Sequence, residues 1–241
     1  MLQLRAAERC RQSCFHEPAR HPMTGVFDPA FEDLPVELPI FPLTGVLLLP
    51  GGRLPLNIFE PRYLNMASSA LAGDRMVGMI QPTGDNEGAQ PAVYRTGCAG
   101  RLTSFSETED GRYLVTLSGF VRFDIDRELP LRDGFRTIVP DWTPYREDLA
   151  ENDSRSIDRD RMLRALKGYF TANQVDANWE AIKDTPTDRL VNALAMMCPF
   201  QPSEKQALLE AVTLVDRADV MVALLEMSLA ANDDTASLHK N

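Results

Sequence analysis

Residues 60–63, Glu-Pro-Arg-Tyr, bring together the side chains that a small polar site would need. A carboxylate, a guanidinium and a phenol held together can move protons or bind a charged ligand. The same residues also suit a structural corner, because Pro61 fits the first turn of a helix and Glu60 would face the positive end of the helix dipole. Arg62 could reach back to a carboxylate, and Tyr63 could pack its ring on the neighbouring strands. We expect the structural role to dominate, with Glu60, Arg62 and Tyr63 as candidate binding residues.

A second group that could do chemistry lies near the N-terminus. Cys10, Cys14, His16 and His21 are residue types that bind zinc, and four of them would complete a tetrahedral site. No hairpin or helix pattern frames them, and the Cys-x-His spacing is tight for one metal ion. We therefore predict no metal site.

Other catalytic patterns are missing from the sequence. There is no phosphate-binding loop of the Walker type and no dinucleotide-binding glycine motif. Beyond the first 22 residues the only histidine is His239, so the usual proton shuttle of serine and cysteine hydrolases is missing. We predict no catalytic residues, no cofactor and no enzymatic activity.

The composition is typical of a water-soluble globular protein, with 44% hydrophobic and 25% charged residues. No apolar run is long enough to span a bilayer, so we expect a cytoplasmic protein without a membrane partner. The solitary cysteines Cys98 and Cys198 have small or apolar neighbours, and we expect buried free thiols.

The formal net charge of -10 argues against nucleic-acid binding, which depends on clustered basic residues. RNA binding stays open as an alternative because four arginines could form a basic strip, and acidic residues are interspersed with them. A small-molecule-binding protein is a second alternative, which the sequence cannot test. The four arginines are Arg95, Arg101, Arg112 and Arg122.

The region from residue 38 to residue 140 has the pattern of short strands separated by proline and glycine turns. The clearest hairpin is closed by Asp110-Gly111, a dipeptide that accepts the positive φ of a tight turn. A helix is expected at 61–71. The expected strands are 38–41, 46–49, 53–58, 76–81, 100–107, 112–118, 120–125 and 135–139.

After Trp142 the apolar residues follow a helical period. We expect a helix over 162–170, a second that begins with Thr185 as the capping residue and Pro186 at its first position, and a third opened by a capping box at Ser203. The last helix is expected over 214–230. The fold class is therefore α+β, with a closed or nearly closed barrel followed by helices.

Residues 38–66, LPIFPLTGVLLLPGGRLPLNIFEPRYLNM, resemble the amino-terminal domain of the Lon protease family. Shorter matches follow at 73–75, 97–100 and 110–113, and the helical stretch NALAMMCPFQPSEKQALLEA at 192–211 is similar to the bundle after the barrel in this family. The resemblance implies a PUA-like β-barrel followed by an α-helical bundle. It also implies a stand-alone bacterial protein of this type, without the ATPase and protease modules.

From this resemblance we expect a non-enzymatic module that binds unfolded or partly folded polypeptide, as an adaptor for protease or chaperone machinery. The expected organisation has four parts. They are a disordered N-terminal extension at 1–35, the barrel at 36–145, the helical subdomain at 146–231 and a flexible tail at 232–241. We also expect Met23 to be the true start of the protein, since a normal globular pattern begins there.

Overall fold

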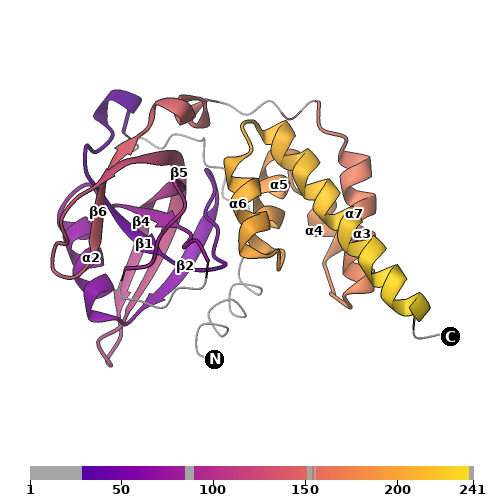
Figure 1. The fold of residues 1–241 in the computed structure, drawn as a ribbon, viewed down its shortest axis with the longest axis horizontal. Coiled ribbons are helices and arrows are strands. Elements are labelled where there is room, and N and C mark those ends of the chain that lie inside the picture. The colour runs from indigo at the N-terminus through magenta and orange to yellow at the C-terminus, as the bar shows by residue number, and fades with distance from the viewer. Residues whose placement is uncertain (1–28, 85–89, 151–153, 155, 239–241) are drawn as a thin grey trace.

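The computed structural model describes residues 29–84, 90–150, 154 and 156–238. A strand-built half and a helical half lie side by side (Figure 1), which confirms the predicted α+β class. Among the described residues, no helix combines the length and the apolar character needed to cross a membrane. The first 22 residues and the candidate zinc ligands lie outside the described part of the chain.

Six strands form the PUA-like barrel, in the order β2-β5-β4-β3-β1-β6. The long strand β5 also pairs with β6, which closes the sheet on itself. All pairings are antiparallel except that of β1 with β3. The strands are β1 (Leu38–Pro42), β2 (Arg53–Ile58), β3 (Met76–Ile80), β4 (Thr96–Glu107), β5 (Tyr113–Glu128) and β6 (Arg136–Asp141).

The hairpin between β4 and β5 turns where the sequence predicted, and Gly111 has a φ of 75°. The segment 120–125 was predicted as a separate strand, but it is the continuation of β5. Register shifts beside Gly100 and between Ile125 and Arg127 bend this long strand, so that its first part pairs with β2 and its last part with β6.

The predicted strand at 46–49 is wrong. Leu47, Leu48 and Leu49 are buried, yet they belong to no strand. Their side chains fill the space between the sheet and the helices. The four apolar residues in a row therefore reflect burial on all sides and not hydrogen-bonded pairing within the sheet. The next residues join β5 instead, through Gly119, whose N–H donates to the carbonyl oxygen of Gly52 over 2.8 Å.

Among the described residues, one helix and two 3-10 helices cover the barrel. Helix α2 (Pro61–Ala72) packs against one face of the sheet, while η1 (Phe31–Asp33) and η2 (Thr143–Leu149) pack against the other. Residues 29–35 fall in the segment expected to be disordered, but Leu34 is buried and the indole N–H of Trp142 donates to the carbonyl oxygen of Pro35. The packed part of the chain therefore includes these residues.

The helical half differs from the prediction at the helix ends. Pro186 is the N-cap of its helix, and the hydroxyl of Thr185 donates to the preceding helix at Ala181. The capping box belongs to Gln201, whose N–H donates to Glu204. The last helix continues past residue 230. The helices are α3 (Arg159–Ala172), α4 (Trp179–Asp184, not predicted), α5 (Thr187–Met197), α6 (Pro202–Glu210) and α7 (Leu214–Leu238).

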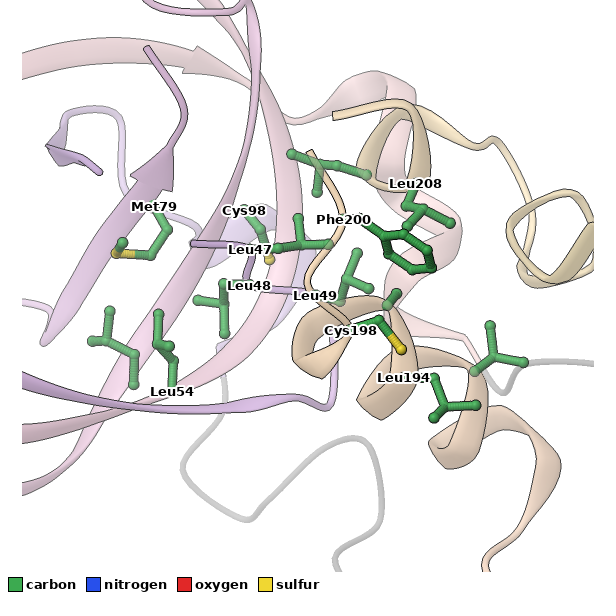
Figure 2. Packing of buried hydrophobic residues seen from close by; sticks show 14 of the residues in the cluster. Leu47, Leu48, Leu49, Leu54, Met79, Cys98, Leu194, Cys198, Phe200 and Leu208 are labelled. Carbon is green, nitrogen blue, oxygen red and sulfur yellow. The ribbon is translucent and has the colours of Figure 1, made fainter. Parts of the chain in front are cut away.

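One hydrophobic core runs through both halves. Figure 2 shows Leu47, Leu48 and Leu49 beside the strands, with Phe200 and Leu208 of the helical half facing them. All five residues are buried in the same apolar cluster. Burial of this surface stabilises each half only when the other is present.

Polar contacts cross the same junction. Arg122 on β5 is 4% exposed and forms an ion pair with Asp148 at 2.7 Å. Its guanidinium also donates to the carbonyl oxygens of Leu209, Ala211 and Val212, which follow or end α6. Burial alone would lower the pKa of Arg122, but the hydrogen bonds and the charge of Asp148 raise it overall. A charged arginine therefore joins the barrel to the end of a helix, where cations are favoured.

Candidate functional site

The barrel leaves two strand edges without a neighbour among the described strands. Strand β2 pairs with β5 alone. Strand β4 pairs with β3 only as far as Arg101, so residues 103–107 pair with β5 on one side alone. Unpaired N–H and C=O groups at such edges can pair with another extended chain.

We call this three-stranded region the flap: β2, residues 102–107 of β4 and residues 113–118 of β5. Residues 103–107 are exposed on both faces, so this part of β4 projects into solvent. Its edge has no proline, whereas β2 contains Pro55, which cannot donate a backbone hydrogen bond. The β4 edge is therefore the better template for an added strand.

An apolar patch lies at the end of the flap. Phe105 is 43% exposed and meets Tyr113 edge-on, with 4.9 Å between the ring centroids. Leu114 is 44% exposed on the opposite face, because neighbouring residues of a strand point to opposite sides. Phe59, directly after β2, is 51% exposed, and the guanidinium of Arg112 lies 5.8 Å from its ring centroid. The patch offers exposed aromatic surface beside an open strand edge.

The corner at residues 60–63 lies between the end of β2 and the first turn of α2. The guanidinium of Arg62 bonds to the carboxylate of Glu60, at 2.9 Å and 3.1 Å, and lies 4.5 Å from the ring centroid of Tyr63. Tyr63 is buried and packs against Phe41 of β1, and burial raises the pKa of its hydroxyl. The three residues lie together, as the sequence predicted, in a contact that orients the first turn of α2.

A hydroxyl contact connects α2 to the flap. The hydroxyls of Ser68 and Tyr113 are 3.3 Å apart, so the aromatic patch sits next to the exposed side of the helix. From the sequence we expect exposed apolar residues around the strand edges and the 82–92 loop as the contact zone, but the sequence does not single out Phe105, Leu114 or Phe59. The alternation of Tyr113 and Leu114 was visible, but periodicity alone could not show that this strand end leaves the barrel.

The four arginines of the predicted basic strip do not form a free basic surface. Arg122 is buried against Asp148, Arg95 lies 3.3 Å from Asp124, and Arg112 lies 2.7 Å from Asp110. The remaining one, Arg101, is partly buried. Phosphate binding needs accessible cations, so this strip offers little support for RNA binding.

Residues 37–227 match the family model described as the ATP-dependent protease La (LON) substrate-binding domain. The chain belongs to this family. It is 26% identical over 193 residues to a Lon protease of Flavobacterium johnsoniae, covering 78% of this chain and 23% of that protein. It is 25% identical over 199 residues to Lon protease 2 of Myxococcus xanthus, covering 80% and 24%. The chain thus spans about a quarter of the length of these relatives.

Solved structures show the same Lon-type fold. The Lon N-terminal domain protein from Xanthomonas campestris superposes with a TM-score of 0.54 at 22% identity, covering 78% of this chain and 97% of that one. The N-terminal domain of Mycobacterium avium complex Lon protease gives a TM-score of 0.56 at 14% identity, covering 79% and 98%. Barrel and helical half together therefore correspond to the Lon substrate-binding domain.

Proposed function

We propose that this Lon substrate-binding domain is a non-enzymatic module that binds unfolded or partly folded polypeptide at the flap. An extended chain would add as a strand to the β4 edge at 103–107, and its apolar side chains would contact Phe105, the exposed ring on that edge strand. Main-chain hydrogen bonds supply affinity that depends little on sequence, and the aromatic patch favours apolar residues. The open edge beside exposed aromatic residues is the observation that carries the proposal.

Unfolded chains expose both of the features that this surface can pair with. Their backbone groups are free to join a strand edge, and their apolar side chains are not buried. Folded proteins hide both, so the flap would discriminate by accessibility rather than by a sequence motif. We further propose that the module acts as an adaptor, presenting bound chains to protease or chaperone machinery.

The test is binding of a labelled, permanently unfolded protein, such as a reduced and alkylated secretory protein, measured by fluorescence anisotropy. The double variant Phe105→Ser and Leu114→Ser should weaken binding at least tenfold, since ~1.4 kcal/mol of lost contact is one decade in affinity. Met227→Gln is the matched control, because Met227 is 67% exposed on α7, away from the flap.

Equal weakening by both variants, or no binding by the unaltered protein at micromolar concentration, would contradict the proposal. Mass spectrometry of the bound polypeptide after long incubation, with and without ATP, tests the non-enzymatic part. The expected result is an intact polypeptide. Cleavage that persists through repurification would show an activity that the proposed function does not include.

A further inference from the structure

The hydrogen-bond pattern of the flap determines which backbone groups of β4 reach its open edge. The N–H of Thr108 donates to the carbonyl oxygen of Arg112 over 2.9 Å, so the backbone of Thr108 points to β5. In an antiparallel ladder this direction alternates from residue to residue, so the backbone of Ser106 also points to β5. The N–H and C=O groups of Phe105 and Glu107 therefore point the other way, to the open edge.

The start of β3 limits the length of this edge. The N–H of Leu102 donates to the carbonyl oxygen of Arg75 over 2.8 Å, and the N–H of Arg75 donates in turn to Ala70 of α2. The register of β4 shifts between Leu102 and Ser104, which makes Thr103 the additional residue of a β-bulge. An added strand would thus continue the line of β3 beyond Arg75 and run antiparallel to β4, as β3 does. Only a short segment can pair there.

The added strand would have one face toward the barrel. Residues directly opposite each other in a ladder point to the same face, and Phe105 lies opposite Val115, which is buried. Helix α2 borders the same face, because the hydroxyls of Ser68 and Tyr113 are 3.3 Å apart. A residue that pairs with Phe105 would therefore place its side chain beside the rings of Phe105 and Tyr113.

The second outward position carries a negative charge. Glu107 lies opposite Tyr113 and is exposed. In the adjoining turn, Glu109 and Asp110 are acidic, and the charge of Arg112 is paired with Asp110 at 2.7 Å. Like charges directly opposite each other destabilise a strand pair. A residue that pairs with Glu107 should therefore not be acidic.

We propose that the flap recognises two residues of the bound polypeptide, a step that rests on the proposed function. One residue pairs with Phe105 and is aromatic or β-branched, because it packs against two rings. The residue two positions before it pairs with Glu107 and is neutral or basic. Neither is proline, since both donate a backbone hydrogen bond to the edge. The residue between them points its backbone away from β4 and is unrestricted.

Exchange of the backbone amide hydrogens tests this pairing. The labelled protein is followed by NMR with and without a reduced and alkylated secretory protein. The amides of Phe105 and Glu107 should exchange rapidly in the free protein and about tenfold or more slowly in the complex. The amide of Ser106 should be protected in both states, because it bonds to β5. Binding that leaves the fast exchange of Phe105 and Glu107 unchanged would overturn the two-residue pairing.

A synthetic probe tests the sequence pattern. The probe is fluorescein-Gly-Ser-Thr-Lys-Thr-Tyr-Thr-Ser-Gly-amide, and its binding is measured by fluorescence anisotropy. N-methylation at the Tyr or the Lys removes a donor to the edge and should weaken binding about tenfold. N-methylation at the Thr between them is the matched control and should change binding less than about twofold. Equal losses at all three positions, or no binding of the probe at millimolar concentration, would overturn the proposal.

A change of charge tests the role of Glu107. Replacing the Lys of the probe by Glu should weaken binding about fivefold, and this difference should fall below about twofold in the Glu107→Gln variant. Glu109→Gln is the matched control, because Glu109 lies in the turn beyond the paired residues, and it should retain the difference. A difference that survives Glu107→Gln unchanged would overturn the proposal.

The probe and the unfolded protein can fail separately. If the unfolded protein binds but the probe does not, the two-residue pairing is refuted and the flap proposal stands. If the probe follows the pattern but the unfolded protein does not bind, the pairing is supported and the proposed function is refuted.

Discussion

Replacing Asp148 by alanine removes the carboxylate that faces Arg122 inside the barrel–helix junction. The guanidinium is 4% exposed and its pKa is raised overall, so it stays charged at neutral pH. Its backbone partners remain, but its counter-ion is gone. Breaking a buried pair in this way costs about 3–5 kcal/mol, a large part of the roughly 5–15 kcal/mol that stabilises a typical domain.

The assay is urea unfolding followed by tryptophan fluorescence. The two tryptophans report both halves, since Trp142 packs at the barrel face and Trp179 begins α4. With a urea dependence of about 2–3 kcal/mol per molar, the Asp148→Ala midpoint should fall by about 1–2.5 M. Asp126→Ala is the matched control, because the Asp126–Arg127 pair is exposed and such pairs contribute about 0–1 kcal/mol.

A midpoint for Asp148→Ala that matches that of Asp126→Ala would refute the reasoning. A second variant checks its cause. The apolar pair Arg122→Met with Asp148→Leu removes both charges, so it should be more stable than Asp148→Ala if an orphaned charge is the problem. It should remain less stable than the unaltered protein, because the carbonyl oxygens of Leu209, Ala211 and Val212 lose their donor. Both tryptophans should report one transition in the unaltered protein, since the two halves share a core.

Three further outcomes follow from buried groups. Thr137→Val should raise the free energy of unfolding, measured in urea, by about 1 kcal/mol, because it removes a buried hydroxyl that has no hydrogen-bond partner among the described residues; a loss of stability would contradict this. Gly119→Ala should cost about 1–3 kcal/mol in the same assay, because its Cβ would clash with the backbone oxygen of Leu49, and an unchanged midpoint would count against the tight packing. Cys98 and Cys198 should resist a thiol reagent at pH 8 when the two cysteines of the first 22 residues are replaced by serine, because burial raises the pKa of both thiols, that of Cys198 to about 12; fast reaction without denaturant would disprove their burial.

The sequence predicted most elements of the barrel because their signals are local. Proline and glycine mark the turns, and the strand β2 was found with the bounds that the structure has. The segment 46–49 was misassigned because four consecutive apolar residues look alike in a strand and in a fully buried extended segment. The partner that decides between them lies in the helical half, far along the chain.

The candidate site was less accessible to sequence reasoning. The corner at 60–63 was correctly brought together, because all of its contacts are between near neighbours in the chain. The flap depends on where β3 stops pairing with β4, and no local pattern encodes that end. Acidic neighbours of the four arginines were visible in the sequence, and Arg95 and Arg112 do pair with such acids. The burial of Arg122 was not visible, since its partner Asp148 belongs to another element.

The core that Leu49 and Phe200 share limits how this domain can be truncated or fused to another protein. A fragment that ends before the helices would expose these buried leucines to solvent, so we expect it to aggregate or unfold. Fusions and truncations should therefore keep residues 29–230 together, so that both halves are present.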